Sequence, residues 1–92
     1  MYAISYDFDT DAMKLYLGTS YCNGYTIFKK FMKKYGFRSQ QGSLLYADPS
    51  VTSVEAVLAI QSASQNFTWL KDCVKDIRLL EVAHDDDLSI LL

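Results

Sequence analysis

Asp7 is the first residue of this chain that could do chemistry, and it ends an apolar segment rich in strand-forming residues. Large and small side chains alternate from Tyr2 to Tyr6, as expected for a half-buried strand. Because neighbouring side chains of a strand point to opposite faces, Asp7 should share a face with Ala3 and Ser5. A carboxylate beside such small residues has room for a partner, a metal ion or a phosphate. The alternative is that Asp7 caps the turn after the strand.

Two further candidate groups follow along the chain. In the segment Gln41–Leu44, glycine lets the backbone approach a ligand, and the Ser43 hydroxyl can donate to a phosphate oxygen. The same Gly-Ser pair is also ordinary turn chemistry. Arg78 lies inside an expected strand, where an unpaired charge is unfavourable. It should therefore pair with an acid such as Asp76 or Glu81, or face a groove.

Basic residues gather near the end of an expected helix, on the side opposite its aromatic stripe. They are Lys29, Lys30, Lys33 and Lys34, with Arg38 just beyond. Cations near the carboxyl end of a helix are stabilised by its dipole. Cations on one face are also typical of contact with an RNA backbone. Both interpretations stay open at this point.

Other titratable patterns do not match known sites. The segment Asp7–Asp11 lacks the glycine and the glutamate of a calcium loop, since Ala12 and Gly18 stand at those positions. It also lacks the Thr or Val that haloacid-dehalogenase phosphatases carry where Asp11 stands. Its acids after Asp7 are therefore interpreted as solvated loop residues. His84 has no second histidine or cysteine nearby to complete a metal site.

Six elements are expected to position these groups. Strands are predicted over 2–7, 37–39, 42–46 and 76–82, and helices over 19–35 and 53–64. Residues 8–18 are predicted to be a polar connection, and Gln40 and Gln41 to join two strands of a hairpin. The first helix carries an apolar stripe of Tyr25, Phe28, Phe31, Met32 and Tyr35. The second is expected to bury Val54, Val57, Leu58 and Ile60.

This order predicts one α+β domain over residues 1–92 with the ferredoxin-like arrangement βαββαβ. It is a four-stranded antiparallel sheet with two helices on one face. The tail, residues 84–92, ends in apolar side chains that should not be left in water, namely Leu88, Ile90, Leu91 and Leu92. The tail is expected either to make a contact in a two-fold dimer or to fold on its own subunit.

Composition narrows the protein classes. Half of the 92 residues are hydrophobic, and a chain of this size buries only about 60–65% of its unfolded surface, so a partner subunit would stabilise it. The net charge of −2 gives no general attraction to nucleic acid, and RNA binding would need a local basic patch. Cys22 and Cys73 do not have the spacing of a metal-ligand pair. No signal peptide or membrane-spanning run is found, so a reduced, cytoplasmic protein is expected.

Three blocks of the chain together resemble the virulence-associated protein D (VapD) family. They are Met1–Asp7, Tyr35–Phe37 with Gln41–Tyr46, and Trp69 with Val74–Arg78. The resemblance runs in order from residue 1 to about residue 82. It implies a small bacterial ferredoxin-like endoribonuclease, typically a dimer and in several cases the toxin of a toxin–antitoxin pair. It also implies a fold akin to the small nuclease-like subunit of CRISPR spacer acquisition.

The resemblance also assigns roles to residues. It carries the strand-end acid of the family onto Asp7, its serine onto Ser43, and its Asp-Ile-Arg onto residues 76–78. It implies catalysis by Asp7 and Ser43, with RNA contacts from Arg78, Lys29, Lys33 and Arg38. Lys75 departs from the family pattern, because an arginine is common there, and so does Leu79-Leu80, which replaces a small-then-aromatic pair.

A homodimer would bring Asp7 and its symmetry mate together in one shared site. Either Mg²⁺ held by Asp7 would activate a water molecule, or one carboxylate would take the proton of a ribose 2′-OH. An antitoxin protein is the other expected partner.

The alternative function is a non-catalytic ferredoxin-like scaffold that binds RNA or a protein, because this fold hosts many functions. A scaffold should tolerate Asp7→Asn, whereas a nuclease should lose activity. A small-molecule-sensing domain is a third interpretation, for which the chain shows no pocket signature.

Overall fold

Four strands form one antiparallel sheet in the order β2-β3-β1-β4. The computed structural model describes residues 1–82, apart from the side chains of Gln40 and Gln41. The strands are β1 (Tyr2–Phe8), β2 (Phe37–Gln41), β3 (Leu44–Ala47) and β4 (Val74–Glu81). The first and third strands lie in the centre of the sheet, and β2 and β4 form its edges. The predicted α+β, ferredoxin-like fold is confirmed.

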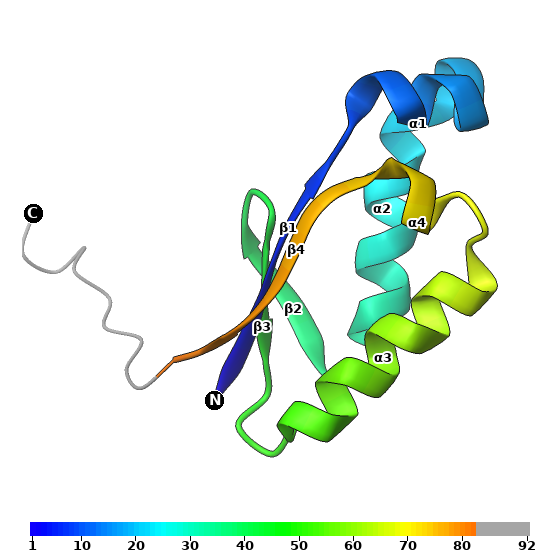
Figure 1. Cartoon of the computed structure of the whole chain (residues 1–92). Helices are drawn as coiled ribbons and strands as arrows, with labels where there is room; N and C mark the ends of the chain where they lie inside the picture. The colour runs from blue at the N-terminus through cyan, green and yellow to red at the C-terminus, as the bar shows by residue number, and fades with distance from the viewer. Residues whose placement is uncertain (83–92) are drawn as a thin grey trace, which may run out of the picture.

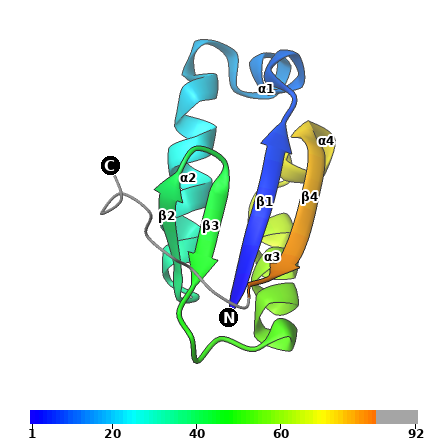
Figure 2. The ribbon, with the colours of Figure 1, turned by 90° about the vertical axis from the view of Figure 1, so that its left-hand side faces the viewer.

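Two long helices, α2 (Tyr21–Lys33) and α3 (Ser53–Asn66), lie against one face of the sheet (Figure 1). Three shorter elements accompany them: α1 (Thr10–Leu17), the 3₁₀ turn η1 (Gly18–Ser20) and α4 (Leu70–Cys73). The opposite face of the sheet is covered by no helix of residues 1–82 (Figure 2). We call it the uncovered face. No helix in this part of the chain combines the length and the apolar character needed to cross a bilayer.

The prediction of a polar connection over residues 8–18 is wrong, because most of this segment is helix α1. Asp9 begins the helix, since its carboxylate accepts hydrogen bonds from the backbone N–H groups of Asp11 and Ala12 at 3.0 and 3.2 Å. Such a cap satisfies donors that the first helical turn leaves free. Met13 anchors the helix by full burial in the core. Asp9 is thus a helix cap rather than a solvated loop acid.

The turn of the β2–β3 hairpin also differs from the prediction by two residues. Strand β2 continues through Gln41, which pairs with Leu44, so the connection is Gly42-Ser43. Gly42 has a φ of +52°, which glycine adopts at the first central position of a tight hairpin turn without strain. This turn places Ser43 at the end of the hairpin nearest to the end of β1, where Tyr6 donates its N–H to the Ser43 carbonyl oxygen.

Helix α3 buries a different face from the one predicted. Its buried residues are three alanines, Ala56, Ala59 and Ala63. The residues expected inside are largely exposed, namely Val54 at 65%, Val57 at 49% and Leu58 at 52%, while Ile60 is half-buried. Small alanine side chains let a helix approach its neighbours closely, and this explains why the alanine face packs inward.

The core between the sheet and the helices is aromatic where it supports the end of β1. Tyr6 and Phe8 pack against Phe28 of α2, with ring centroids 5.0 and 5.4 Å from it. The predicted stripe of α2 is confirmed for Phe28 and Met32, which are fully buried. Because Tyr6 and Phe8 both point to the helices, Asp7 between them points to the uncovered face.

Candidate active site

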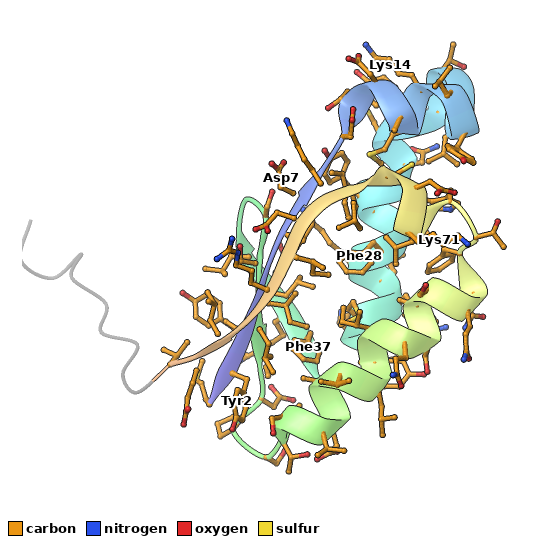
Figure 3. The ribbon with its side chains drawn as sticks, viewed as in Figure 1. Tyr2, Asp7, Lys14, Phe28, Phe37 and Lys71 are labelled. Atoms are coloured by element: carbon orange, nitrogen blue, oxygen red, sulfur yellow. The ribbon has the colours of Figure 1, made fainter. Side chains whose placement is uncertain are left out.

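Asp7 lies on the uncovered face of the sheet near the carboxyl end of β1, and its side chain is exposed (Figure 3). Within residues 1–82 its carboxylate takes part in no hydrogen bond or ion pair. Asp9, and not Asp7, caps the following helix. The capping alternative for Asp7 is therefore excluded, and the carboxylate is available for a ligand.

Asp76 of β4 is the neighbour of Asp7 across the strands, because the two residues pair directly in the sheet register. Opposed residues on one sheet face have Cβ atoms about 4.5–5.5 Å apart, so the two carboxylates share one surface. Arg78 pairs with Ser5 on the same face. Its Nε donates to both carboxylate oxygens of Asp76, at 3.1 and 3.2 Å. The predicted pairing of Arg78 with an acid is confirmed.

This ion pair contributes little to stability, because both partners are exposed and such pairs are worth about 0–1 kcal/mol. Its effect is to place a fixed positive charge beside two carboxylates. Only Nε of Arg78 contacts Asp76, so its two terminal NH₂ groups have no partner among residues 1–82. Those groups can bind a phosphate, for which the planar guanidinium is well suited.

Ser43 lies beside this group, because the N–H of Tyr6 donates to its carbonyl oxygen over 3.0 Å. The residue is exposed in the hairpin turn. The structure thus brings Asp7 of β1, Asp76 and Arg78 of β4, and Ser43 of the β2–β3 turn to the same end of the sheet. We call these four residues the Asp7 cluster.

A bulge in β4 lies next to the Asp7 cluster. Asp7 pairs with Asp76, but Phe8 pairs with Val74, so Lys75 is an extra residue in the ladder. Bulges of this kind redirect side chains and occur often beside active sites. Lys75 is exposed and adds a second cation to this end of β4.

The other predicted RNA contacts gather at the opposite edge of the sheet. Lys29, Lys33 and Arg38 line an open groove of about 330 Å³ between α2 and β2, together with Lys30, Phe37 and Ser39. We call it the lysine groove. Arg38 also pairs with Asp48, with an N–O distance of 3.5 Å. Arg78 does not join this group, because it lies on β4 at the other edge.

The residues of the Asp7 cluster could hold a hydrated Mg²⁺, but they are too few to enclose a metal ion completely. Residues 1–82 contain no group of three or more histidine, cysteine or acidic side chains that could enclose a metal ion. Asp7 and Asp76 supply two carboxylates, and Mg²⁺ is usually held by one or two carboxylates together with water and substrate phosphates. Asp7 is the freer ligand of the two, because Arg78 engages Asp76.

Neither cysteine belongs to the site. Both are free, and Cys22 is exposed whereas Cys73 is buried. Burial raises the pKa of the Cys73 thiol, which keeps it protonated and poorly nucleophilic. The tail over residues 84–92, with His84 and the predicted dimer contact, lies outside the described residues.

Asp76 was predicted as a partner for Arg78 and as the first residue of the family's Asp-Ile-Arg, but not as a neighbour of Asp7. Its place opposite Asp7 follows from the register of β1 and β4 and from the bulge at Lys75. An acid in each of two neighbouring strands was the only signal of this arrangement in the sequence.

Comparison with known proteins gives relatives that match nearly end to end. The chain is 36% identical over 89 residues to Endoribonuclease VapD 2 of Riemerella anatipestifer, covering 96% of this chain and 95% of that protein. It is 32% identical over 88 residues to the Endoribonuclease VapD homolog of Helicobacter pylori, covering 96% and 92%. It is 28% identical over 92 residues to Endoribonuclease VapD of Dichelobacter nodosus, covering 100% and 97%. No family model matches the chain.

Proposed function

The chain belongs to the endoribonuclease VapD family, and on this premise we propose that it is an endoribonuclease that cleaves phosphodiester bonds within RNA. One observation of the site carries the proposal. Asp7 is an exposed carboxylate with no partner in residues 1–82, and it lies across the strands from Asp76 and its bound Arg78. Three relatives that match over nearly the full chain are named endoribonucleases, which supports the same activity.

The proposed reaction uses Asp7 as a general base. Its carboxylate takes the proton of a ribose 2′-OH, and the 2′ oxygen attacks the adjacent phosphorus. The bond from phosphorus to the 5′ oxygen breaks, and that oxygen leaves with a proton from water. A positioned general base typically contributes a rate factor of about 10²–10⁴.

Charge on the phosphate would be stabilised by the rest of the cluster. The terminal NH₂ groups of Arg78 can donate to the phosphate oxygens, and the Ser43 hydroxyl can add a third donor. Asp76 holds the guanidinium in place through two hydrogen bonds to its Nε. Asp7 and Ser43 are therefore the proposed catalytic residues, and Asp76 is a positioning residue.

The alternative route that we propose to test uses Mg²⁺ as a cofactor, with Asp7 as its main ligand in place of its role as general base and Asp76 as the second ligand. When bound, it would neutralise phosphate charge and activate water.

The lysine groove is proposed to bind the RNA backbone away from the scissile bond. Lys29, Lys33 and Arg38 surround it, and such contacts to phosphates are independent of sequence. This local basic patch offsets the overall net charge of −2, which would otherwise repel RNA.

We propose a homodimer formed through the uncovered face. Besides the Asp7 cluster, this face carries Ala3, which pairs with Tyr46 and Leu80, and Leu44, which pairs with Ser5. Leu80 is 40% exposed in the single chain. A two-fold axis through this face would bring the two copies of Asp7 together. Sedimentation of a monomer at micromolar concentration would count against it.

A role as the toxin of a bacterial toxin–antitoxin pair, acting in the cytoplasm, is the further proposal that the family resemblance supports. Expression of the chain should then arrest growth of a bacterial host, and co-expression of a neighbouring antitoxin should relieve the arrest. Asp7→Asn should not arrest growth.

The decisive experiment is single-turnover cleavage of a structured RNA by the purified chain, with and without EDTA. Asp7→Asn is the test variant, and Glu81→Gln is the control, because Glu81 is an exposed acid at the far end of β4. We expect the control to cleave and Asp7→Asn to lose activity while keeping its fold. Equal cleavage by all three preparations would indicate a contaminant. RNA binding without cleavage by any of them would support the scaffold function instead.

A further inference from the structure

Helix α3 carries two apolar stripes, and the fold of residues 1–82 buries only one. The alanine stripe faces inward, as described above. The second stripe consists of Val54, Val57 and Leu58, spaced three and four residues apart, and each is about half exposed or more. A helix that is apolar on opposite sides is normally buried on both. Something is therefore expected to cover the second stripe.

Two hollows show that this stripe belongs to a larger surface. A groove of about 190 Å³ between α3 and β4 is lined by Ile4, Ala56, Val57, Ile60, Gln61, Ile77, Arg78 and Leu79. A second hollow on the outer side of α3 is lined by Ser53, Val54, Val57, Leu58 and Gln61. Because Val57 and Gln61 line both, the hollows form one continuous surface, which we call the α3 surface. Contiguous apolar patches are uncommon on monomers unless they bind something.

We propose that the carboxyl-terminal segment of the same chain, residues 83–92, docks on the α3 surface. The segment begins close to the α3 surface. It follows Val82, and Leu79, three residues earlier, lines the groove. Val82 is held by two hydrogen bonds with Met1, at 2.8 and 3.3 Å, so the starting point of the segment is fixed. The end of β4 and the first turn of α3 lie at the same end of the molecule (Figures 1 and 2).

The length and composition of the segment fit this path. Its first five residues, 83–87, include three aspartates and span up to about 17 Å when extended. A helix is about 10–12 Å across with its side chains, so this spacer can lead the chain from the edge strand over α3. Four of the five residues that follow are apolar, namely Leu88, Ile90, Leu91 and Leu92. They match the chemistry of the surface they would cover.

Docking within one chain is favoured over docking on a second copy. A short tether gives its own segment an effective concentration of about millimolar, well above a micromolar protein concentration. This placement also leaves the uncovered face free for the proposed dimer. The α3 surface shares only Arg78 with the Asp7 cluster, and docking is measured without RNA, so the inference is tested independently of nuclease activity.

The test is paramagnetic relaxation enhancement by NMR on the full chain. A nitroxide label is attached at Ser89→Cys in a Cys22→Ser background, where the remaining Cys73 is fully buried. Spin-labelled ¹⁵N chain is diluted with unlabelled ¹⁴N chain. We expect strong broadening of the amide signals of Val54, Val57 and Leu58, and none at the lysine groove.

Two variants and one mixing experiment decide the outcome. Val57→Asp should abolish the broadening of the α3 signals, whereas Ser64→Asp, an exposed site on the same helix, should leave it intact. A mixture of ¹⁵N chain without label and ¹⁴N chain with label reports docking between copies. Broadening of the α3 signals in this mixture as strong as in the diluted sample would assign the segment to a second copy and overturn the proposal. Absence of broadening at α3 in the diluted sample would overturn it as well.

Discussion

Replacement of Asp76 by asparagine tests whether this residue acts by positioning Arg78 rather than by supporting the fold. The two carboxylate oxygens of Asp76 accept hydrogen bonds from Nε of Arg78, at 3.1 and 3.2 Å. Asp76 also lies directly opposite Asp7 in the sheet. The substitution keeps the size of the side chain and removes its charge. It therefore removes both the ion pair with Arg78 and the repulsion with Asp7.

The expected change in stability is small because these two effects oppose each other. Loss of an exposed ion pair costs about 0.2–1 kcal/mol. Removal of the repulsion between two like charges that face each other across the strands stabilises the fold by about 0.2–1 kcal/mol. The net free energy of unfolding should change by less than about 0.8 kcal/mol, which keeps the melting temperature within about 6 °C of wild type.

The expected change in activity is much larger. Without Asp76 the guanidinium of Arg78 is no longer held, and a displacement of about 1 Å at a reacting centre can cost about 10²-fold in rate. That factor corresponds to about 2.7 kcal/mol of transition-state stabilisation. Single-turnover cleavage and thermal unfolding of the same preparations measure both quantities, with Glu81→Gln as the matched control on β4.

A double-mutant cycle with Arg78→Gln gives the sharpest test. If Asp76 acts through Arg78, the double variant should be about as slow as the slower single variant. If the two rate factors multiply, Asp76 acts independently of Arg78. Unchanged activity of Asp76→Asn, or a fall in melting temperature beyond about 8 °C, would also refute the positioning role.

Three further predictions concern other parts of the molecule. Gly36→Ala should lower the free energy of unfolding by about 1–3 kcal/mol in chemical denaturation, because Gly36 has a φ of +87° and an added Cβ would lie 2.9 Å from a methyl group of Val51. Replacement of Lys29 and Lys33 by serine should weaken RNA binding and reduce the slope of log K against log salt by about 2 in a fluorescence titration, whereas a contribution limited to the helix dipole would leave the slope unchanged. Burial raises the pKa of the Tyr6 hydroxyl to about 12, so the unfolded chain loses this proton first and stability should fall as pH rises above about 10. Tyr6→Phe should reduce this alkaline loss in urea melts at pH 9 and pH 11, and it should also raise stability at neutral pH, because the buried hydroxyl has no hydrogen-bond partner among residues 1–82.

Local patterns were sufficient to predict the sheet and the two long helices. The alternation that ends at Asp7 predicts strand β1 and its buried face, and the apolar stripe through Phe28 does the same for helix α2. Asp7 and Arg78 could be found for the same reason, since each is a charged residue in an apolar strand pattern. Ser43 was found as a possible phosphate donor and through the family resemblance. The family resemblance had the same basis, in blocks of residues that follow one another.

Local patterns do not predict the structure where packing decides between two of them. On α3, both the alanines and the larger residues Val54 and Val57 repeat at helical spacing, and hydrophobicity alone favours the larger ones. Close contact between helix and sheet favours alanine, and this depends on the distance between layers. The role of Asp76 depends on register, and the bulge at Lys75 changes the register by one residue. Helix α1 is short, and its capping residue, Asp9, resembled a loop acid.

The alanine face of α3 has a consequence for how sequences of this family can drift. Ala56, Ala59 and Ala63 are almost completely enclosed, so a larger side chain at any of them would cost about 1–3 kcal/mol of the 5–15 kcal/mol that holds a typical domain together. Val54 and Val57 face no such barrier on the described surface, where polar replacements would cost the fold little. Homologues should therefore keep small residues at the three alanine positions whatever their tails contain. They should keep apolar residues at the two valine positions only while another segment binds there. Homologues that lose the apolar segment should therefore also lose the apolar residues at these positions.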